Sequence, residues 1–139
     1  MPNDIDITII TEKNLKINEE GFHVSILPPK AFFINPPSII NTLFREGYSL
    51  KYNRAFAENF RFINRVLFKY ELKNHSLSDK VRIVNILRGK DGEKGFVQEN
   101  EGEWLANQVF IVPVGIEHLF EKFLLNSEVK FKKIYLLMH

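Results

Sequence analysis

The sequence predicts an α+β fold in which about three helices pack on a mainly antiparallel sheet, within a single domain spanning residues 1–139. The length of 139 residues is close to the commonest size of one domain, and no repeat, low-complexity tract or linker divides the chain. Strand-like alternation of apolar residues opens and closes the sequence, whereas helical spacing occurs between these ends. Because the helical segments do not alternate regularly with strands, the pattern favours α+β over a parallel α/β sheet.

The N-terminal region is predicted to contain two strands. Apolar residues alternate with polar ones over residues 5–9 and again over 22–26. With a turn at Glu19-Glu20-Gly21, the two runs are expected to form a hairpin. Leu15 and Ile17 leave room for a third short strand between them.

Two helices are predicted next. Pro36-Pro37-Ser38 is a suitable opening for a helix over residues 38–46, which Gly47 would end. A second helix is expected from an N-cap at Asn53 to about Lys69. Its apolar stripe consists of Phe56, Phe60, Ile63 and Leu67, and its opposite face carries Arg54, Arg61 and Arg65 together with Glu58.

The second half of the chain is predicted to return to strands. Asp91-Gly92 is a strong hairpin signal, so residues 88–95 are expected to be the tip between two strands. The remaining elements are a strand over 81–86, its return at 96–98, a strand from about 108 to 113, a helix over 116–124 and a final strand over 131–138.

The composition excludes several classes of function. The chain has no Cys, so disulfides and thiolate chemistry are absent, which favours a cytoplasmic location. The acidic start resembles no signal peptide, and no apolar run approaches the roughly 20 residues that span a bilayer. We therefore expect no membrane association.

Charge is unevenly distributed along the chain. Residues 31–90 carry eleven bases and four acids, a net of +7, whereas residues 91–128 carry eight acids and two bases, a net of −6. This polarity predicts one basic and one acidic region on the fold, or two segments that pair with each other.

No motif predicts catalysis, a metal or a cofactor. No Gly-x-Ser-x-Gly elbow occurs, and no two His residues have the spacing that forms a zinc site on a helix. Gly89, Gly92 and Gly95 match neither phosphate-binding fingerprint. Glu117 and Glu121 share one helix face and are interpreted as a solvated first turn. The chain is therefore expected not to be an enzyme, unless a pocket places His23, His75 or His118 beside a carboxylate.

The leading hypothesis is a non-enzymatic protein-binding module, either an inhibitor- or immunity-type protein or an adaptor within a larger assembly. Its docking face would be the acidic segment, because Glu99, Glu101 and Glu103 would share one face of a strand, next to Trp104. The partner's identity and the oligomeric state stay open.

The alternative hypothesis is a nucleic-acid-binding domain. A basic helix with Arg54, Arg61 and Arg65 and a hairpin tip with Arg88 and Lys90 would neutralise phosphates if both lay on one surface. The pI of about 8.8 and the absence of an RNP-like aromatic motif argue against this reading.

Overall fold

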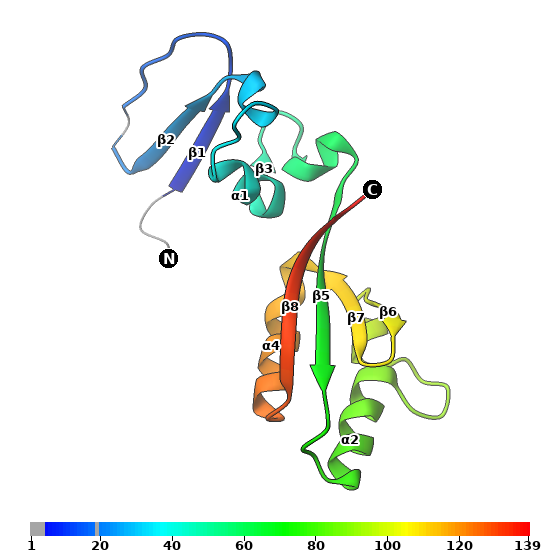
Figure 1. Cartoon of the computed structure of the whole chain (residues 1–139). Coiled ribbons are helices and arrows are strands. Elements are labelled where there is room, and N and C mark those ends of the chain that lie inside the picture. The colour runs from blue at the N-terminus through cyan, green and yellow to red at the C-terminus, as the bar shows by residue number, and fades with distance from the viewer. Residues whose placement is uncertain (1–4, 19) are drawn as a thin grey trace. The chain divides into compact units, whose positions relative to one another are not determined.

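The computed structural model describes residues 5–18 and 20–139. They divide into two compact units, Met1–Thr42 and Leu43–His139, and each is described by itself. The predicted α+β class with an antiparallel sheet is confirmed: unit 2 holds a four-stranded antiparallel sheet with helices packed on it (Figure 1).

Unit 1 is built on a pair of strands, β1 (Ile5–Ile10) and β2 (Phe22–Leu27). Both strands were predicted, but the expected hairpin is wrong, because the pair is parallel, with Ile5 opposite Phe22. The connection between the strands is long enough to return the chain to its starting end. The third short strand that the sequence left open does not form, since Leu15 and Ile17 lie in irregular structure. Of the predicted turn, Glu19 lies outside the described residues.

The end of unit 1 leads into the first α-helix. After η1 (Pro29–Phe32), helix α1 (Ile39–Glu46) confirms the helix predicted for 38–46 and ends just before Gly47. Unit 2 begins within this helix, and it continues through β3 (Tyr48–Ser49), β4 (Arg54–Ala55) and η2 (Phe56–Phe60). The ring centroid of Phe44 lies 5.4 Å from that of Phe56 and 5.2 Å from that of Phe60, so an aromatic cluster holds this segment together.

The remainder of unit 2 follows a β-α-β-β-α-β order. Every neighbouring pair in its sheet is antiparallel, and the strand order is β6-β7-β5-β8. This order and these connections define the ferredoxin-like, or split β-α-β, topology. The elements are β5 (Ile63–Glu71), α2 (Leu77–Arg88), α3 (Phe96–Glu99), β6 (Glu103–Ala106), β7 (Val109–Pro113), η3 (Val114–Ile116), α4 (Glu117–Asn126) and β8 (Lys130–Met138).

The core of unit 2 lies between the sheet and its helices. Alternate residues of the central strands, such as Phe68 and Phe110, are fully buried. Phe120 of α4 packs on both, at ring-centroid distances of 6.0 and 5.3 Å. The strand from about 108, the helix over 116–124 and the last strand over 131–138 are confirmed.

The predicted helix over 53–69 is wrong. Arg61 adopts a left-handed conformation with φ 61° and ends η2, after which the chain runs extended as β5. Val66, Phe68 and Tyr70 alternate, and all three are buried. Burial of this period-two set on the sheet outweighs the helical spacing of the Phe and Ile residues before it.

The predicted strand and hairpin over 81–98 are also wrong. Helix α2 covers the strand residues, and its N-cap Ser76 accepts a hydrogen bond from the Asp79 amide at 3.1 Å. Asp91 and Gly92 do form a turn, with φ values of 56° and 89°, but this turn connects α2 to α3. Residues 96–98, expected to return as a strand, belong to α3.

Candidate protein-docking face

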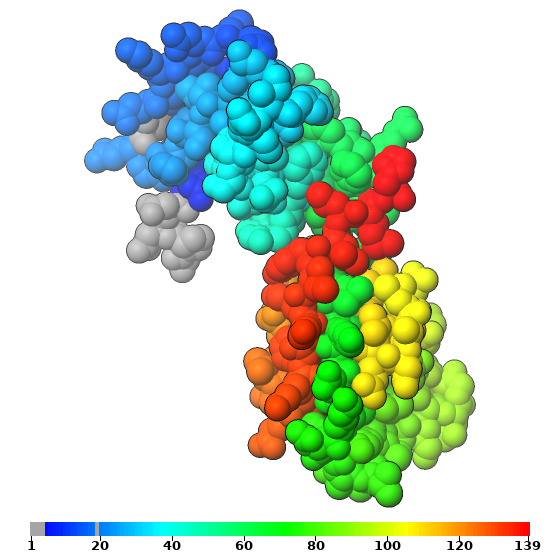
Figure 2. Space-filling model, in the orientation of Figure 1, coloured from blue at the N-terminus to red at the C-terminus, as the bar shows by residue number. Residues whose placement is uncertain are grey.

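The sheet of unit 2 has one face that its helices do not cover. Along β5, Val66, Phe68 and Tyr70 pack toward the helices, so the alternate residues project from the other side. Figure 2 shows β8, β5 and β7 in red, green and yellow, side by side with no helix in front of them. We call this side the uncovered face; on the two strands β5 and β8 it carries Arg65, Leu67, Lys69, Glu71, Lys130, Lys132, Ile134 and Leu136.

Three lysines gather at one end of the uncovered face. Lys69 of β5 lies directly opposite Lys132 of β8, and Lys130 lies opposite Glu71. These residues and Phe131 line a hollow of about 260 Å³, which we call the lysine hollow. In the described part of the chain, none of these three lysines forms a close ion pair, and Glu71 is the one carboxylate that lines the hollow.

The charges of the lysine hollow are unfavourable for the stability of the sheet. Like charges directly opposite each other on neighbouring strands are destabilising. Lys69 and Lys132 are both exposed, so water reduces the repulsion without removing it. Arrangements that break a local rule of stability are typical of functional sites. A ligand carrying carboxylates would relieve this repulsion.

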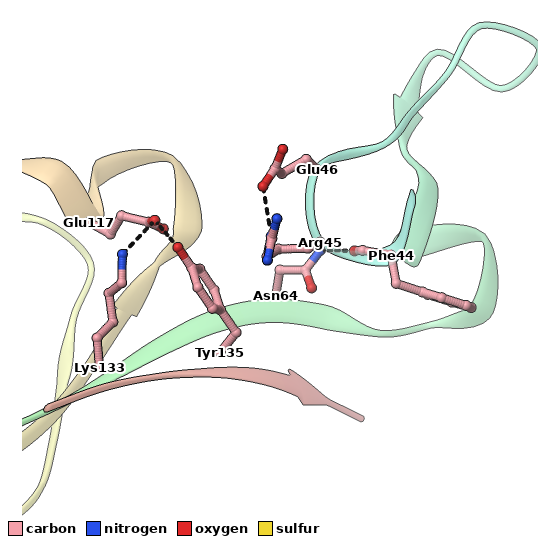
Figure 3. Close-up of polar contacts among 7 residues, drawn as sticks. All are labelled: Phe44, Arg45, Glu46, Asn64, Glu117, Lys133 and Tyr135. Atoms are coloured by element: carbon pink, nitrogen blue, oxygen red, sulfur yellow. Dashed lines mark hydrogen bonds and ion pairs between the residues drawn. The ribbon is translucent and has the colours of Figure 1, made fainter. Parts of the chain in front are cut away.

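The other side of β8 is held to α4 by a polar cluster (Figure 3). Lys133 Nζ lies 2.5 Å from Glu121 Oε1 and 3.5 Å from Glu117 Oε1, and the Tyr135 hydroxyl donates to Glu117 Oε1 at 2.5 Å. The hydrogen bond to Glu121 raises the pKa of Lys133 above its ordinary value. Arg45 adds a contact from α1, with its guanidinium carbon 5.0 Å from the Tyr135 ring centroid. This cluster fixes β8 while the opposite side of the strand stays open.

Glu117 and Glu121 do share a helix face, as predicted, but they are not a freely solvated first turn. Both carboxylates reach Lys133, and the Glu117 side chain is only 17% exposed. The second oxygen of Glu117, Oε2, is buried and has no hydrogen-bond partner among the described residues. The pair therefore has a structural role in joining α4 to β8.

The acidic segment does not lie along one strand, so the predicted shared face is wrong. Glu99 ends α3, Glu101 lies in the following turn with φ 56°, and only Glu103 belongs to β6. All three side chains are exposed. Trp104 is directed to the helix side, where its ring lies 5.2 Å from Phe110. Trp104 is therefore a half-buried packing residue and not part of an exposed acidic rim.

The basic residues of the nucleic-acid hypothesis are not brought onto one surface. Arg65 projects from the uncovered face, whereas Arg88 stacks on Trp104 on the helix side, 3.8 Å from its ring centroid. Arg54 donates to Asn59 Oδ1 at 2.7 Å, and Lys90 lies 3.7 Å from Asp91 in the turn after α2. Arg61 is exposed at the end of η2. The basic helix and basic hairpin on which the hypothesis depended do not form.

The His residues have surface or packing environments. His23 Nδ1 lies 3.1 Å from Asp6 Oδ1, but both side chains are about three quarters exposed, at 76% and 74%. His75 Nε2 lies 3.0 Å from the Ser127 carbonyl oxygen, and His118 is exposed. Among residues 5–18 and 20–139, no group of three His, Asp or Glu side chains could hold a metal ion. Among the described residues, no helix is both long and apolar enough to cross a membrane.

The sequence prediction did not single out the lysine hollow. Lys130 and Lys132 alternate within the terminal strand, but lysines in such a strand are also a common guard against edge pairing, so the pattern alone does not indicate a site. Lys69 was assigned to a helix, so its position opposite Lys132 could not be anticipated. The pairing depends on the register of β5 with β8, two strands that lie far apart in the sequence.

Fold and site together define a ferredoxin-like domain with a basic uncovered sheet face. Comparisons with protein-family models, with curated proteins and with solved structures found no match to the chain. The geometry of the uncovered face is therefore the basis on which a function can be inferred.

Proposed function

We propose that the chain is a cytoplasmic, non-enzymatic protein-binding module that docks an acidic protein on the uncovered face. The observation that carries the proposal is the lysine hollow, where Lys69 and Lys132 lie opposite each other without a counter-ion in the described structure. Carboxylates of a partner would turn this repulsion into attraction, and complementary charge would accelerate association. An inhibitor or an adaptor within an assembly would both use such a face.

Protein is favoured over nucleic acid as the ligand. Single-stranded nucleic acids are bound by aromatic side chains that stack on bases, together with cations. The residues that β5 and β7 direct to the uncovered face are aliphatic or charged: Leu67 lies opposite Ile111, which is itself buried, and Arg65 lies opposite Pro113. Phe131, which also lines the lysine hollow, has its ring 5.8 Å from that of the core residue Phe68. A surface that is mainly basic and aliphatic better suits a protein with acidic and aliphatic side chains.

The test is capture of a partner from the native lysate by the tagged full chain, with nuclease added to half of the sample. Four proteins are compared: the wild type and three charge-reversal variants. The first variant, Lys69→Glu with Lys132→Glu, reverses the lysine hollow. The second, Lys94→Glu with Lys122→Glu, makes the same change in net charge at exposed lysines away from the sheet. The third is Glu99→Lys with Glu101→Lys and Glu103→Lys.

We expect a stoichiometric protein partner that survives nuclease and binds the wild type and the Lys94/Lys122 variant alike. The Lys69/Lys132 variant should lose it, with association slowed by about tenfold or more at low salt. If the acidic-segment variant alone loses the partner, docking uses Glu99, Glu101 and Glu103 instead. Recovery of nucleic acid, with partners lost on digestion, would contradict protein binding.

A further inference from the structure

Strand β8 is an edge of the sheet along its full length. All nine of its residues pair with β5, from Lys130 opposite Glu71 to Met138 opposite Ile63. No described strand pairs with its other side. The backbone groups that point away from β5 therefore form a row of donors and acceptors that could accept another strand.

The two edges of this sheet differ in how they resist pairing. At the opposite edge, β6 is four residues long and has a register shift between Trp104 and Ala106. Short length and a bulge are two common guards of an edge strand. In β8, Lys130 and Lys132 guard the first half, whereas Lys133 is paired with Glu117 and Glu121, and residues 134–138 carry no charge at all. The second half of β8 is thus an unguarded edge.

This half of β8 is both exposed and held in place. Ile134 and Leu137 are 51% and 49% exposed, so apolar surface accompanies the open backbone edge. Tyr135 anchors the strand through its hydrogen bond to Glu117 of α4. A strand fixed in its extended conformation loses little conformational freedom when another strand adds to it.

We propose that the outer edge of β8 binds an extended segment of the partner as an additional antiparallel strand, with an aliphatic half followed by an acidic half. The aliphatic half lies opposite residues 134–138, and the acidic half lies opposite residues 130–133, beside the lysine hollow. In strand addition, main-chain hydrogen bonds give affinity and side-chain contacts give specificity. This inference rests on the proposed function and names the chemistry of the partner.

A second copy of the chain fits this edge less well. If two β8 strands paired antiparallel over all nine residues, Lys130 would face Met138 and Lys132 would face Leu136. The lysines would gain no counter-charge. The chain's own acidic edge, β6, is only four residues long and carries one carboxylate, Glu103. Charge complementarity therefore favours an acidic partner.

The experiment titrates the full chain, labelled with ¹⁵N, with a synthetic nine-residue peptide. Its first five residues alternate Val and Thr, and its last four alternate Glu and Asp. Two further peptides are N-methylated at alternate residues, one at the even and one at the odd positions. Because neighbouring N–H groups of a strand point to opposite edges, only one of these two peptides loses its hydrogen bonds to β8.

We expect amide shifts confined to β8 and β5, and dissociation constants of the two N-methylated peptides that differ by at least about tenfold. A peptide with the acidic half first should bind more weakly. Ile134→Lys should reduce binding, whereas Ile86→Lys, at a residue of α2 with a similar exposure of 44%, should not.

Other results would overturn strand addition. Equal weakening by both N-methylation patterns would mean that the peptide binds through side chains on the uncovered face. In that case the proposed function stands, because its own test is partner capture by the lysine variants. A chain that is dimeric in sedimentation, becomes monomeric with Ile134→Lys and binds no peptide would show that a second copy covers the edge.

Discussion

The repulsion between Lys69 and Lys132 makes a measurable prediction about stability. Replacing Lys132 with Thr removes the like-charge pair, whereas replacing Lys130 with Thr removes the attraction to Glu71. Both positions lie on the same face of the same strand, and both are exposed. The change in intrinsic strand preference is therefore nearly the same in the two variants. The difference between them isolates the cross-strand charges.

The size of this difference follows from the register. One directly opposed pair contributes about 0.2–1 kcal/mol, unfavourable for like charges and favourable for opposite charges. Each lysine is also diagonal to the other's partner, roughly 7–8 Å away, which reduces the contrast. We expect Lys132→Thr to be more stable than Lys130→Thr by about 0.5–1 kcal/mol, or about 2–5 °C in melting temperature.

Urea unfolding of the full chain can measure this difference. Trp104 is the only tryptophan, and its ring packs against Phe110 in the core, so its fluorescence reports on the sheet. The difference should shrink at about 1 M salt, where the screening length is near 3 Å. Equal stabilities at low salt, or a difference that salt does not change, would refute the assigned register of charges.

Three further predictions concern the scaffold. Tyr70→Phe should leave stability unchanged or raise it by about 1 kcal/mol at neutral pH, because the buried hydroxyl has no hydrogen-bond partner within the described part of the chain. Burial raises the pKa of Tyr70, so stability should fall as pH rises above about 10, and the Phe variant should lose this dependence. Ser76→Ala should cost about 1 kcal/mol by removing the N-cap of α2, whereas Ser78→Ala should cost less. Lys133→Met should destabilise the chain by about 1–3 kcal/mol, since it leaves the partly buried Glu117 and Glu121 without their cation. Lys122→Met, on the exposed side of α4, is the matched control. The midpoints of urea unfolding measure the change in stability of each variant.

The fold class could be predicted because several segments carry a single clear period. The helix predicted over 38–46 is observed at Ile39–Glu46, and the strand predicted over 131–138 is observed at Lys130–Met138. In both segments the local pattern and the tertiary environment agree. The helix predicted over 53–69 was wrong because a helical spacing and a strand alternation follow each other within this segment. Phe56, Phe60 and Ile63 are spaced as on a helix, while the alternation that is buried begins only at Val66.

Helix α2 was missed for a different reason. Residues 81–86 are apolar enough to be read as a buried strand, and short apolar runs do not distinguish the two states by periodicity. The capping pair Ser76 and Asp79 is the sequence signal that distinguishes a helix from a strand here. Recognising it would also have placed Asp91-Gly92 between helices and removed the basic hairpin from consideration.

The site was less predictable than the fold because it depends on the register in which β5 pairs with β8. The sequence shows which residues are basic, but it does not show which of them become neighbours in the folded chain. The acidic residues 99–103 lie on three successive structural elements, so their alternation in sequence produced no common face. By contrast, Lys69 and Lys132 were never near each other in the sequence, and the β5–β8 ladder places them side by side.

The lysines and the aliphatic residues of the uncovered face have opposite effects on association: the aliphatic residues favour it, and the lysines restrict it to acidic ligands. A sheet face that only met water would carry mainly polar side chains, yet Leu67, Ile134 and Leu136 lie at its centre. An aliphatic face and an open edge invite association with any exposed strand. The lysine hollow restricts this association, because a ligand without acidic groups would bury uncompensated charge beside the aliphatic surface. In the proposed complex, the same three lysines would disfavour copies of the chain and favour an acidic partner, so reversing them should weaken that complex and change which proteins bind.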